Sequence, residues 1–181
     1  RKPPTPMKDW RALLYNRWDS DKSQHISTFI SSNKEVFEEV FNSFYAEEGH
    51  IAHRSGFILG QTFKKKPALL IPRIGMLLSK MPEPPHEWYR WMTIWYLSHC
   101  KFPAEHDGLA ATYAFEELGK SYAKPAVKNA SMRLLEFVCK RNPELIPEYK
   151  LYLEEVIAHE RKTLATKARK QMLQLRKWEI D

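Results

Sequence analysis

The sequence has little glycine, only two cysteines and no long apolar run, and each shortage excludes a class of protein. Six glycines among 181 residues, with no alternation of β-branched side chains, argue against a β-rich fold. Cys100 and Cys139 are too few for a disulfide framework and indicate a reducing compartment, so we expect a cytoplasmic protein. No apolar run reaches the ~20 residues that span a bilayer, which predicts no membrane segment. The chain starts at Arg1 rather than Met, which is compatible with a processed start.

Motifs of catalysis and metal binding are also missing. The chain has no glycine-rich phosphate loop, no nucleophile elbow, no His-Glu-x-x-His and no paired Cys/His ligands in the pattern of a zinc site. His99, Cys100 and the His106–Asp107 pair flank one expected turn, but their spacing is not that of a zinc site. These shortages favour a non-enzymatic protein without metal or cofactor, and both cysteines are expected to be buried and inert.

Acidic residues are absent from 161–177, and this segment carries the whole charge imbalance. The chain has a formal net charge of +7, from 29 basic and 22 acidic residues. The segment "RKTLATKARKQMLQLRK" holds seven of the basic residues, so the remainder is balanced. This pattern indicates one local cationic strip and not a surface that is basic everywhere.

Apolar residues recur at spacings of three and four along nearly the whole chain, which predicts an all-α fold. A proline-rich arm and short capping helix are expected over 1–19, and a repeat domain over 20–178. Helices are expected at 8–17, 21–31, 34–46, 50–63, 67–80, 86–100, 106–118, 125–141, 144–157 and 160–178.

Three similar junctions divide these helices: "KKKPALLIP" at 64–72, "CKFPAEHDG" at 100–108 and "KRNPELIPEY" at 140–149. Their prolines are 36 and 40 residues apart, a period typical of a two-helix repeat. Lys65, Lys101 and Arg141 hold equivalent places at the end of each first helix, where a cation complements the helix dipole. We expect each junction to be the bend between two antiparallel helices.

The segments "IAHRSGFILGQTFKKKPALLIPRIGMLL" (51–78) and "VKNASMRLLEFVCKRNPELIPEYKLYLEEV" (127–156) resemble HEAT-type helical repeats, especially those of small bacterial HEAT-like proteins. "ATKARKQMLQL" (165–175) resembles the closing helix of such chains. The middle unit departs from the pattern, with three tryptophans in place of small residues. The resemblance implies an α-α superhelix, or solenoid, of about four stacked antiparallel helix pairs, and it implies no enzymatic activity.

The segment "HEWYRWMTIWYL" (86–97) is rich in aromatic residues. Its tryptophans at 88, 91 and 95 share one helical face, and Tyr89, Met92 and Tyr96 share the adjacent face with the same spacing. Most of these rings are expected in the core; the alternative is an exposed aromatic contact for a partner through Trp88 and Trp91. Arg90 matches Arg54 one repeat earlier, so both could lie on a common surface.

The basic segment predicts an amphipathic helix. Its apolar face consists of Leu164, Ala165, Ala168, Met172 and Leu175. Its cations form a solvated capping face or a contact for phosphates or an acidic protein. The candidate interaction surface comprises Arg54, Lys65, Arg90, Lys162, Arg169, Lys170 and Arg176.

The first functional hypothesis is a non-enzymatic helical-repeat scaffold for macromolecular interactions, with a protein as the expected partner. The alternative is a nucleic-acid-binding HEAT-like protein that uses the basic C-terminal helix, related to the alkylpurine DNA glycosylases, which would need a central acidic residue such as Asp107. A small-molecule enzyme is a third hypothesis, disfavoured because the chain lacks a serine-rich catalytic loop.

Overall fold

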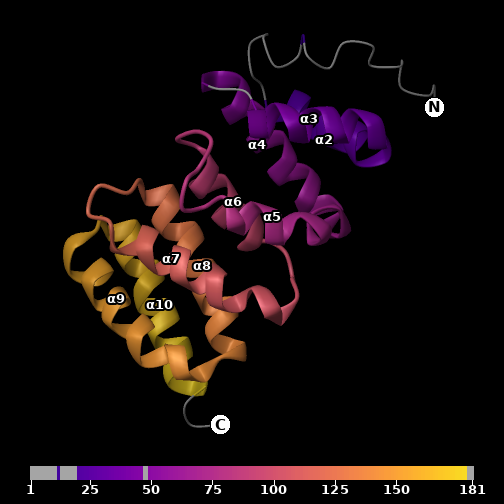
Figure 1. Ribbon diagram of the computed structural model, residues 1–181. Helices are drawn as coiled ribbons and strands as arrows, with labels where there is room; N and C mark the ends of the chain where they lie inside the picture. The colour runs from indigo at the N-terminus through magenta and orange to yellow at the C-terminus, as the bar shows by residue number, and fades with distance from the viewer. Residues whose placement is uncertain (1–11, 13–19, 47–48, 179–181) are drawn as a thin grey trace. The chain divides into compact units, whose positions relative to one another are not determined.

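The computed structural model describes residues 12, 20–46 and 49–178 (Figure 1). Every regular element in these residues is an α-helix or a 3-10 turn, which confirms the all-α prediction. The described residues cluster into two compact units: unit 1 comprises 12, 20–46, 49–73 and 79–92, and unit 2 comprises 74–78 and 93–178. Most of the N-terminal arm and the helix expected at 8–17 lie outside the described residues, and the expected domain bounds remain predictions.

Unit 1 contains α2 (Ser20–Ser32), α3 (Lys34–Ala46) and α4 (Gly49–Lys65). Both α2 and α3 pack on α4. The core includes Phe37, Phe44 and Phe63, none more than 1% exposed, and the Phe37 and Phe63 rings meet edge to face with 6.0 Å between centroids. Residues at helical spacing therefore supply the apolar wall of this unit, as the sequence pattern predicts.

The prediction of a single helix at 67–80 is wrong. The chain instead forms two 3-10 turns, η1 (Pro67–Leu69) and η2 (Ile71–Arg73), followed by the short α5 (Ile74–Ser79). Pro72 lacks the N–H that a continuous helix would need, and its ring disfavours the helical backbone at the residue before it. The helix expected at 86–100 is also shorter, since α6 spans Tyr89–Leu97.

The three proline junctions share one local structure. A 3-10 turn begins at or directly after each proline: η1 at Pro67, η3 (Ala104–His106) after Pro103, and η4 (Pro143–Leu145). The residues before two of these turns have nearly the same backbone angles, φ −137° and ψ 76° at Lys66 and φ −130° and ψ 75° at Asn142. The predicted repetition of the junction is therefore visible in the backbone.

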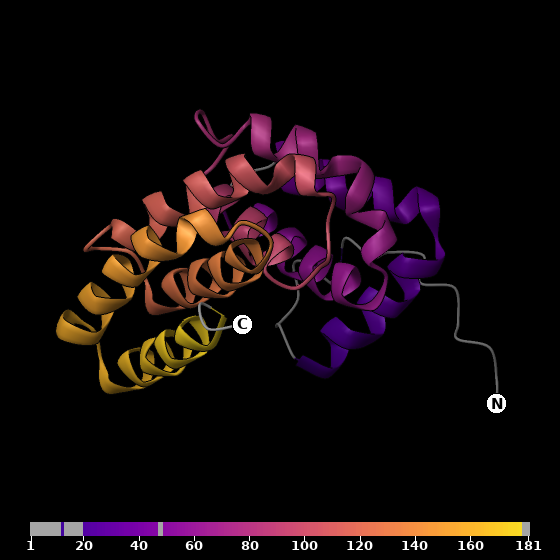
Figure 2. The same cartoon turned by 90° about the horizontal axis from the view of Figure 1, so that it is seen from below.

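Unit 2 is built from α7 (Asp107–Gly119), α8 (Pro125–Arg141), α9 (Ile146–His159) and α10 (Lys162–Trp178) (Figure 2). The pair α7–α8 forms one layer and the pair α9–α10 forms the other. Contacts between α7 and α9 and between α8 and α10 hold the two layers together. Buried Tyr149 of α9 links the layers, since its hydroxyl lies 2.8 Å from the Met132 carbonyl of α8 and 2.5 Å from Oε1 of Gln171 on α10. Burial raises the pKa of Tyr149 well above its usual value, so the hydroxyl stays a donor.

Candidate interaction groove

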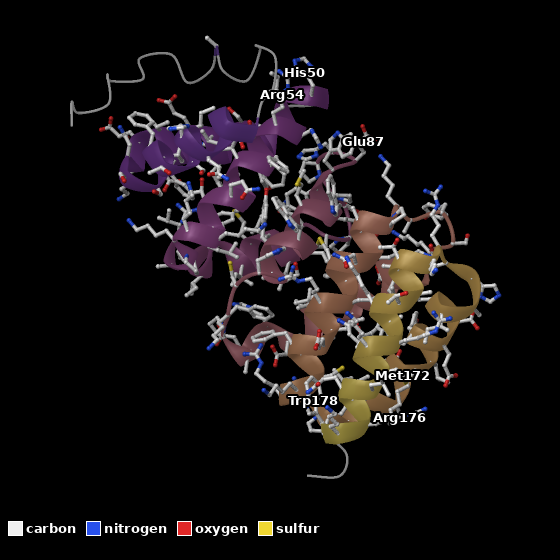
Figure 3. All side chains as sticks on the ribbon, turned by 180° about the vertical axis from the view of Figure 1, so that it is seen from behind. His50, Arg54, Glu87, Met172, Arg176 and Trp178 are labelled. Carbon is white, nitrogen blue, oxygen red and sulfur yellow. The ribbon has the colours of Figure 1, made fainter. Side chains whose placement is uncertain are left out.

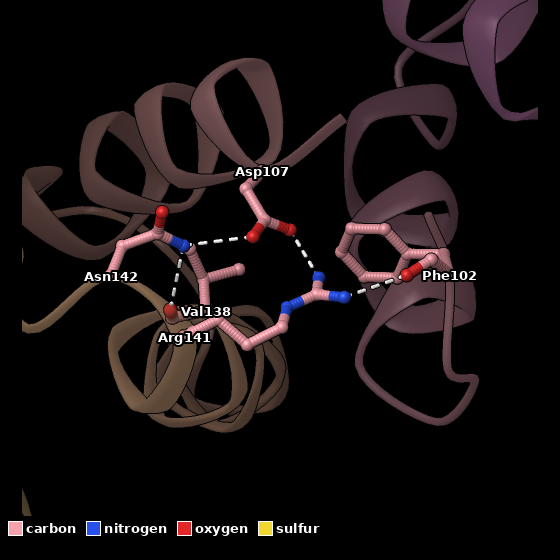
Figure 4. A network of polar contacts seen from close by, with 5 residues as sticks. All are labelled: Phe102, Asp107, Val138, Arg141 and Asn142. Carbon is pink, nitrogen blue, oxygen red and sulfur yellow. Dashed lines mark hydrogen bonds and ion pairs between the residues drawn. The ribbon is translucent and has the colours of Figure 1, made fainter. Parts of the chain in front are cut away.

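The carboxylate of Asp107 is fully engaged in a structural network (Figure 4). Its side chain is only 7% exposed; one oxygen pairs with the Arg141 guanidinium, and the other accepts a 2.8 Å hydrogen bond from the Asn142 amide. Arg141 also donates to the Phe102 carbonyl at 2.8 Å and lies 4.3 Å from the ring centroid of Phe137. Asp107 therefore fixes the start of α7 to the end of α8, and the glycosylase alternative stays a prediction.

The tryptophan row is not the core face of its segment. Trp88, Trp91 and Trp95 are half-buried, whereas Tyr89 and Met92 are 0% exposed and Tyr96 is 1% exposed. Within unit 1, the His53 ring lies against Trp88 and Trp91, with centroid distances of 4.4 and 6.0 Å. Core burial is confirmed for the tyrosine–methionine row, and contact of Trp88 and Trp91 with a partner stays a prediction.

The candidate cations of unit 1 take part in local contacts. Lys65 donates to the Gln24 carbonyl at 2.9 Å and to the Thr28 hydroxyl at 2.6 Å, while its side chain stays exposed. Arg90 donates to the Met81 carbonyl at 2.8 Å. Arg54 lies half-buried near the start of α4, one turn from His50 (Figure 3). These residues belong to unit 1 and the cations of α10 to unit 2, so one surface shared by all of them remains a prediction.

The amphipathic helix predicted for the basic segment is confirmed in α10. All five residues of its expected apolar face are buried, and Lys162, Arg169, Lys170 and Arg176 are exposed. None of these four cations forms an ion pair with a carboxylate in the described part of the chain. Their charge is therefore not neutralised by the neighbouring helices.

A groove follows the seam between α8 and α10. Three connected hollows of about 340, 420 and 410 Å³ make it up. The first two share Asn129 and Lys167; the second and third share Arg133, Glu136 and Gln174. The ionisable side chains that line this α8–α10 groove are Arg133, Lys140, Arg161, Lys167, Lys170 and Glu136. Five cations thus face one carboxylate.

The groove divides the predicted cations of α10 into two sets. Lys170 lines the groove, whereas Lys162, Arg169 and Arg176 line none of its hollows. These three residues recur every seven positions and form a separate outer stripe. Figure 3 labels Arg176 of this stripe and Trp178 of the groove near the same end of α10. Sequence reasoning missed Arg133, Gln174 and Trp178 as groove residues. The spacing of Arg133, Glu136 and Lys140 on α8, and that of Lys170, Gln174 and Trp178 on α10, could have placed each set on one helical face. Neither pattern shows that the two faces meet.

The histidines near the expected turn do not gather around a metal. His99 hydrogen-bonds the Trp95 carbonyl through Nδ1 at 2.9 Å, and Asp107 is committed to Arg141. Among residues 12, 20–46 and 49–178, no group of three or more His, Cys, Asp or Glu side chains is placed to hold a metal ion. No helix in these same residues is long and apolar enough to cross a membrane.

Cys139 is expected to be inert in the folded protein. Its side chain is buried, and burial raises the pKa of the thiol to about 12, so almost no nucleophilic thiolate exists at pH 8. In a Cys100→Ser background, labelling with a thiol reagent at pH 8 should be at least ~100-fold slower for the native than for the urea-unfolded chain. Equal rates in both states would show that Cys139 is accessible and contradict its buried place on α8.

Residues 10–175 match the HEAT repeat domain, which is most of the chain. The protein is therefore a helical-repeat protein, and it belongs to the HEAT repeat family. HEAT repeats commonly serve as scaffolds for protein interactions. No curated protein and no solved structure matches the chain.

Proposed function

We propose that this protein is a non-enzymatic scaffold that holds a protein partner in the α8–α10 groove. The supporting observation is the imbalance of five cations over one carboxylate along a connected surface. Two of these cations, Arg133 and Lys170, are exposed and form no ion pair with any carboxylate of the described residues. Unpaired surface charge of one sign accelerates and orients association with a partner of opposite charge.

The displaced pKa values among the described residues do not support a catalytic role. Burial is the main cause that raises the pKa of Tyr89, of Cys139 and of Tyr149, and it keeps these three groups neutral. A general acid or base works best with a pKa near neutrality, and upward shifts move these groups away from it. Binding is the better-supported role.

Capture of partners by the immobilised full chain tests the proposal. Arg133→Glu with Lys170→Glu reverses the groove charge, and Arg169→Glu with Arg176→Glu makes the same charge change on the outer stripe. Bound proteins are trapped by chemical cross-linking. We expect a partner protein to be enriched on the wild type and on the stripe variant (Arg169→Glu with Arg176→Glu). The same protein should be lost from the groove variant (Arg133→Glu with Lys170→Glu). Equal capture by all three proteins, or capture of nothing specific, would remove the proposed function.

Nucleic-acid binding is the second candidate, because the outer stripe is exposed and acid-free over its whole length. Affinity for duplex DNA across a salt series separates the two candidates. A binder with about five phosphate contacts should show a log–log salt slope near −4.5, which the stripe variant should flatten. Under the scaffold proposal, DNA binding is weak near 0.15 M salt and no weaker in the stripe variant than in the groove variant.

A further inference from the structure

The structure assigns the α8–α10 groove to an extended acidic peptide segment of a protein partner, with an aromatic side chain of that segment placed at the Trp178 end. The inference rests on the proposed function and names the chemistry of the bound segment. It depends on four features of the groove: its length, its charge, the carboxylate at its centre and the aromatic residues at one end.

The length of the groove suits a short extended peptide. Its lining residues on α8 run from Pro125 to Lys140. At about 1.5 Å of rise per helical residue, this stretch measures ~22 Å. An extended chain advances ~3.3 Å per residue, so about seven residues would fill the groove.

The charge of the groove selects an acidic occupant. Cations are distributed over all three hollows: Arg161 and Lys167 in the first, Lys170 with Arg133 in the second, and Lys140 in the third. Lys167 already contacts the Asn129 side-chain oxygen at 2.8 Å, but this neutral acceptor leaves its charge uncompensated. Carboxylates at several positions of a bound peptide could each meet a cation, and charge-assisted hydrogen bonds are the stronger kind.

Glu136 favours a peptide over a nucleic acid. Its Oε2 accepts a 2.7 Å hydrogen bond from Gln171, and Oε1 is not used by any described donor. An ionised carboxylate only accepts hydrogen bonds. A phosphodiester backbone brings acceptors and negative charge and would be repelled here, whereas a peptide offers an N–H at almost every residue. The Gln174 amide, which lines the same two hollows, can donate to or accept from a peptide main chain.

The third hollow provides a place for an aromatic side chain. Phe137 and Trp178 are half-buried and line it together with Lys140. The Lys140 ammonium lies 5.9 Å from the centroid of the Trp178 ring. A peptide aromatic packed between these rings would gain the extra stabilisation of aromatic pairs, and neighbouring peptide carboxylates would lie beside Lys140.

Fluorescence anisotropy with labelled peptides of about nine residues tests the inference on the full chain. The probe is rich in Asp and Glu and carries one Phe near its end; its controls replace Phe with Ser or all acids with their amides. We expect Arg133→Glu with Lys170→Glu to weaken binding at least ~10-fold, and Arg169→Glu with Arg176→Glu to weaken it by less than ~3-fold. Removal of the peptide Phe should weaken binding to the wild type several-fold, and this loss should disappear in Trp178→Ala.

Three results would overturn the inference: equal losses in the groove and stripe variants, equal binding of the amide peptide, or displacement of the probe by single-stranded DNA of equal charge. Circular dichroism of each variant must first show wild-type helix content, and a variant that fails this check is replaced by the milder Arg133→Gln with Lys170→Gln. Groove-dependent capture of a protein partner without any peptide binding would sink only this inference. Loss of both would sink the proposed function as well.

Discussion

Asp107→Ala is expected to lower the free energy of unfolding by about 3 kcal/mol, because it breaks a buried ion pair and leaves its partner without compensation. Asp107 satisfies both the Arg141 guanidinium and the Asn142 amide, and its side chain is 7% exposed. The Arg141 side chain is 30% exposed and can recover some hydration, which places the loss at the lower end of the usual range. Urea unfolding followed by circular dichroism measures the change, and the melting temperature should fall by roughly 6–12 °C.

Glu105→Ala is the matched control for this prediction. The Glu105 side chain is 75% exposed, and its only ionic contact within the described residues is with His106 at 3.5 Å, so its removal should change stability by less than ~0.5 kcal/mol. Asp107→Asn should fall between the two variants, because it keeps a hydrogen-bonding side chain but loses the charge. A loss below ~1 kcal/mol in Asp107→Ala would show that this network does not hold α7 to α8.

Local signals account for the part of the fold that was predictable from the sequence. The predicted bounds of α8, 125–141, agree with the structure because Pro125 can occupy the first turn and Asn142 with Pro143 ends the helix. The buried face of α10 was predictable for a similar reason, since its apolar positions follow one helical period without interruption. Such features depend on residues within a few turns of one another.

Features that depend on distant residues were not predictable. Two rows of large side chains in 86–97 have the same spacing, and the pattern does not say which one faces inward. The structure buries Tyr89 because its ring stacks on Phe44, with 5.4 Å between centroids, and α3 supplies that ring. The groove depends in the same way on the contact of α8 with α10, which brings Arg133 close to Lys170 although no local pattern joins them.

Gly56→Leu is expected to lower the free energy of unfolding by about 3 kcal/mol, through overpacking of the core of unit 1. A Cβ atom at Gly56 would lie 2.8 and 2.9 Å from two carbons of the Phe44 ring and 3.2 Å from Cγ of Met92. The ring cannot move aside easily, because Phe44 is 0% exposed and packs against the rings of both His86 and Tyr89. Gly56 therefore marks a close contact between α4 and the Phe44 ring of α3, and the larger side chain must displace a packed aromatic cluster.

Gly56→Ala and Gly108→Ala separate this overpacking from the intrinsic preference of alanine for helices. Both glycines lie within helices, but a Cβ at Gly108 would meet nothing within 4 Å. Gly108→Ala should therefore stabilise the protein by about 0.5 kcal/mol, whereas the same change at Gly56 should destabilise it by about 1 kcal/mol after the helical gain is subtracted. Thermal and urea unfolding of the three variants would test the ranking. Stabilisation by Gly56→Ala would mean that the Phe44 cluster is looser than its contacts indicate, because only a cluster able to shift could accommodate the added methyl group.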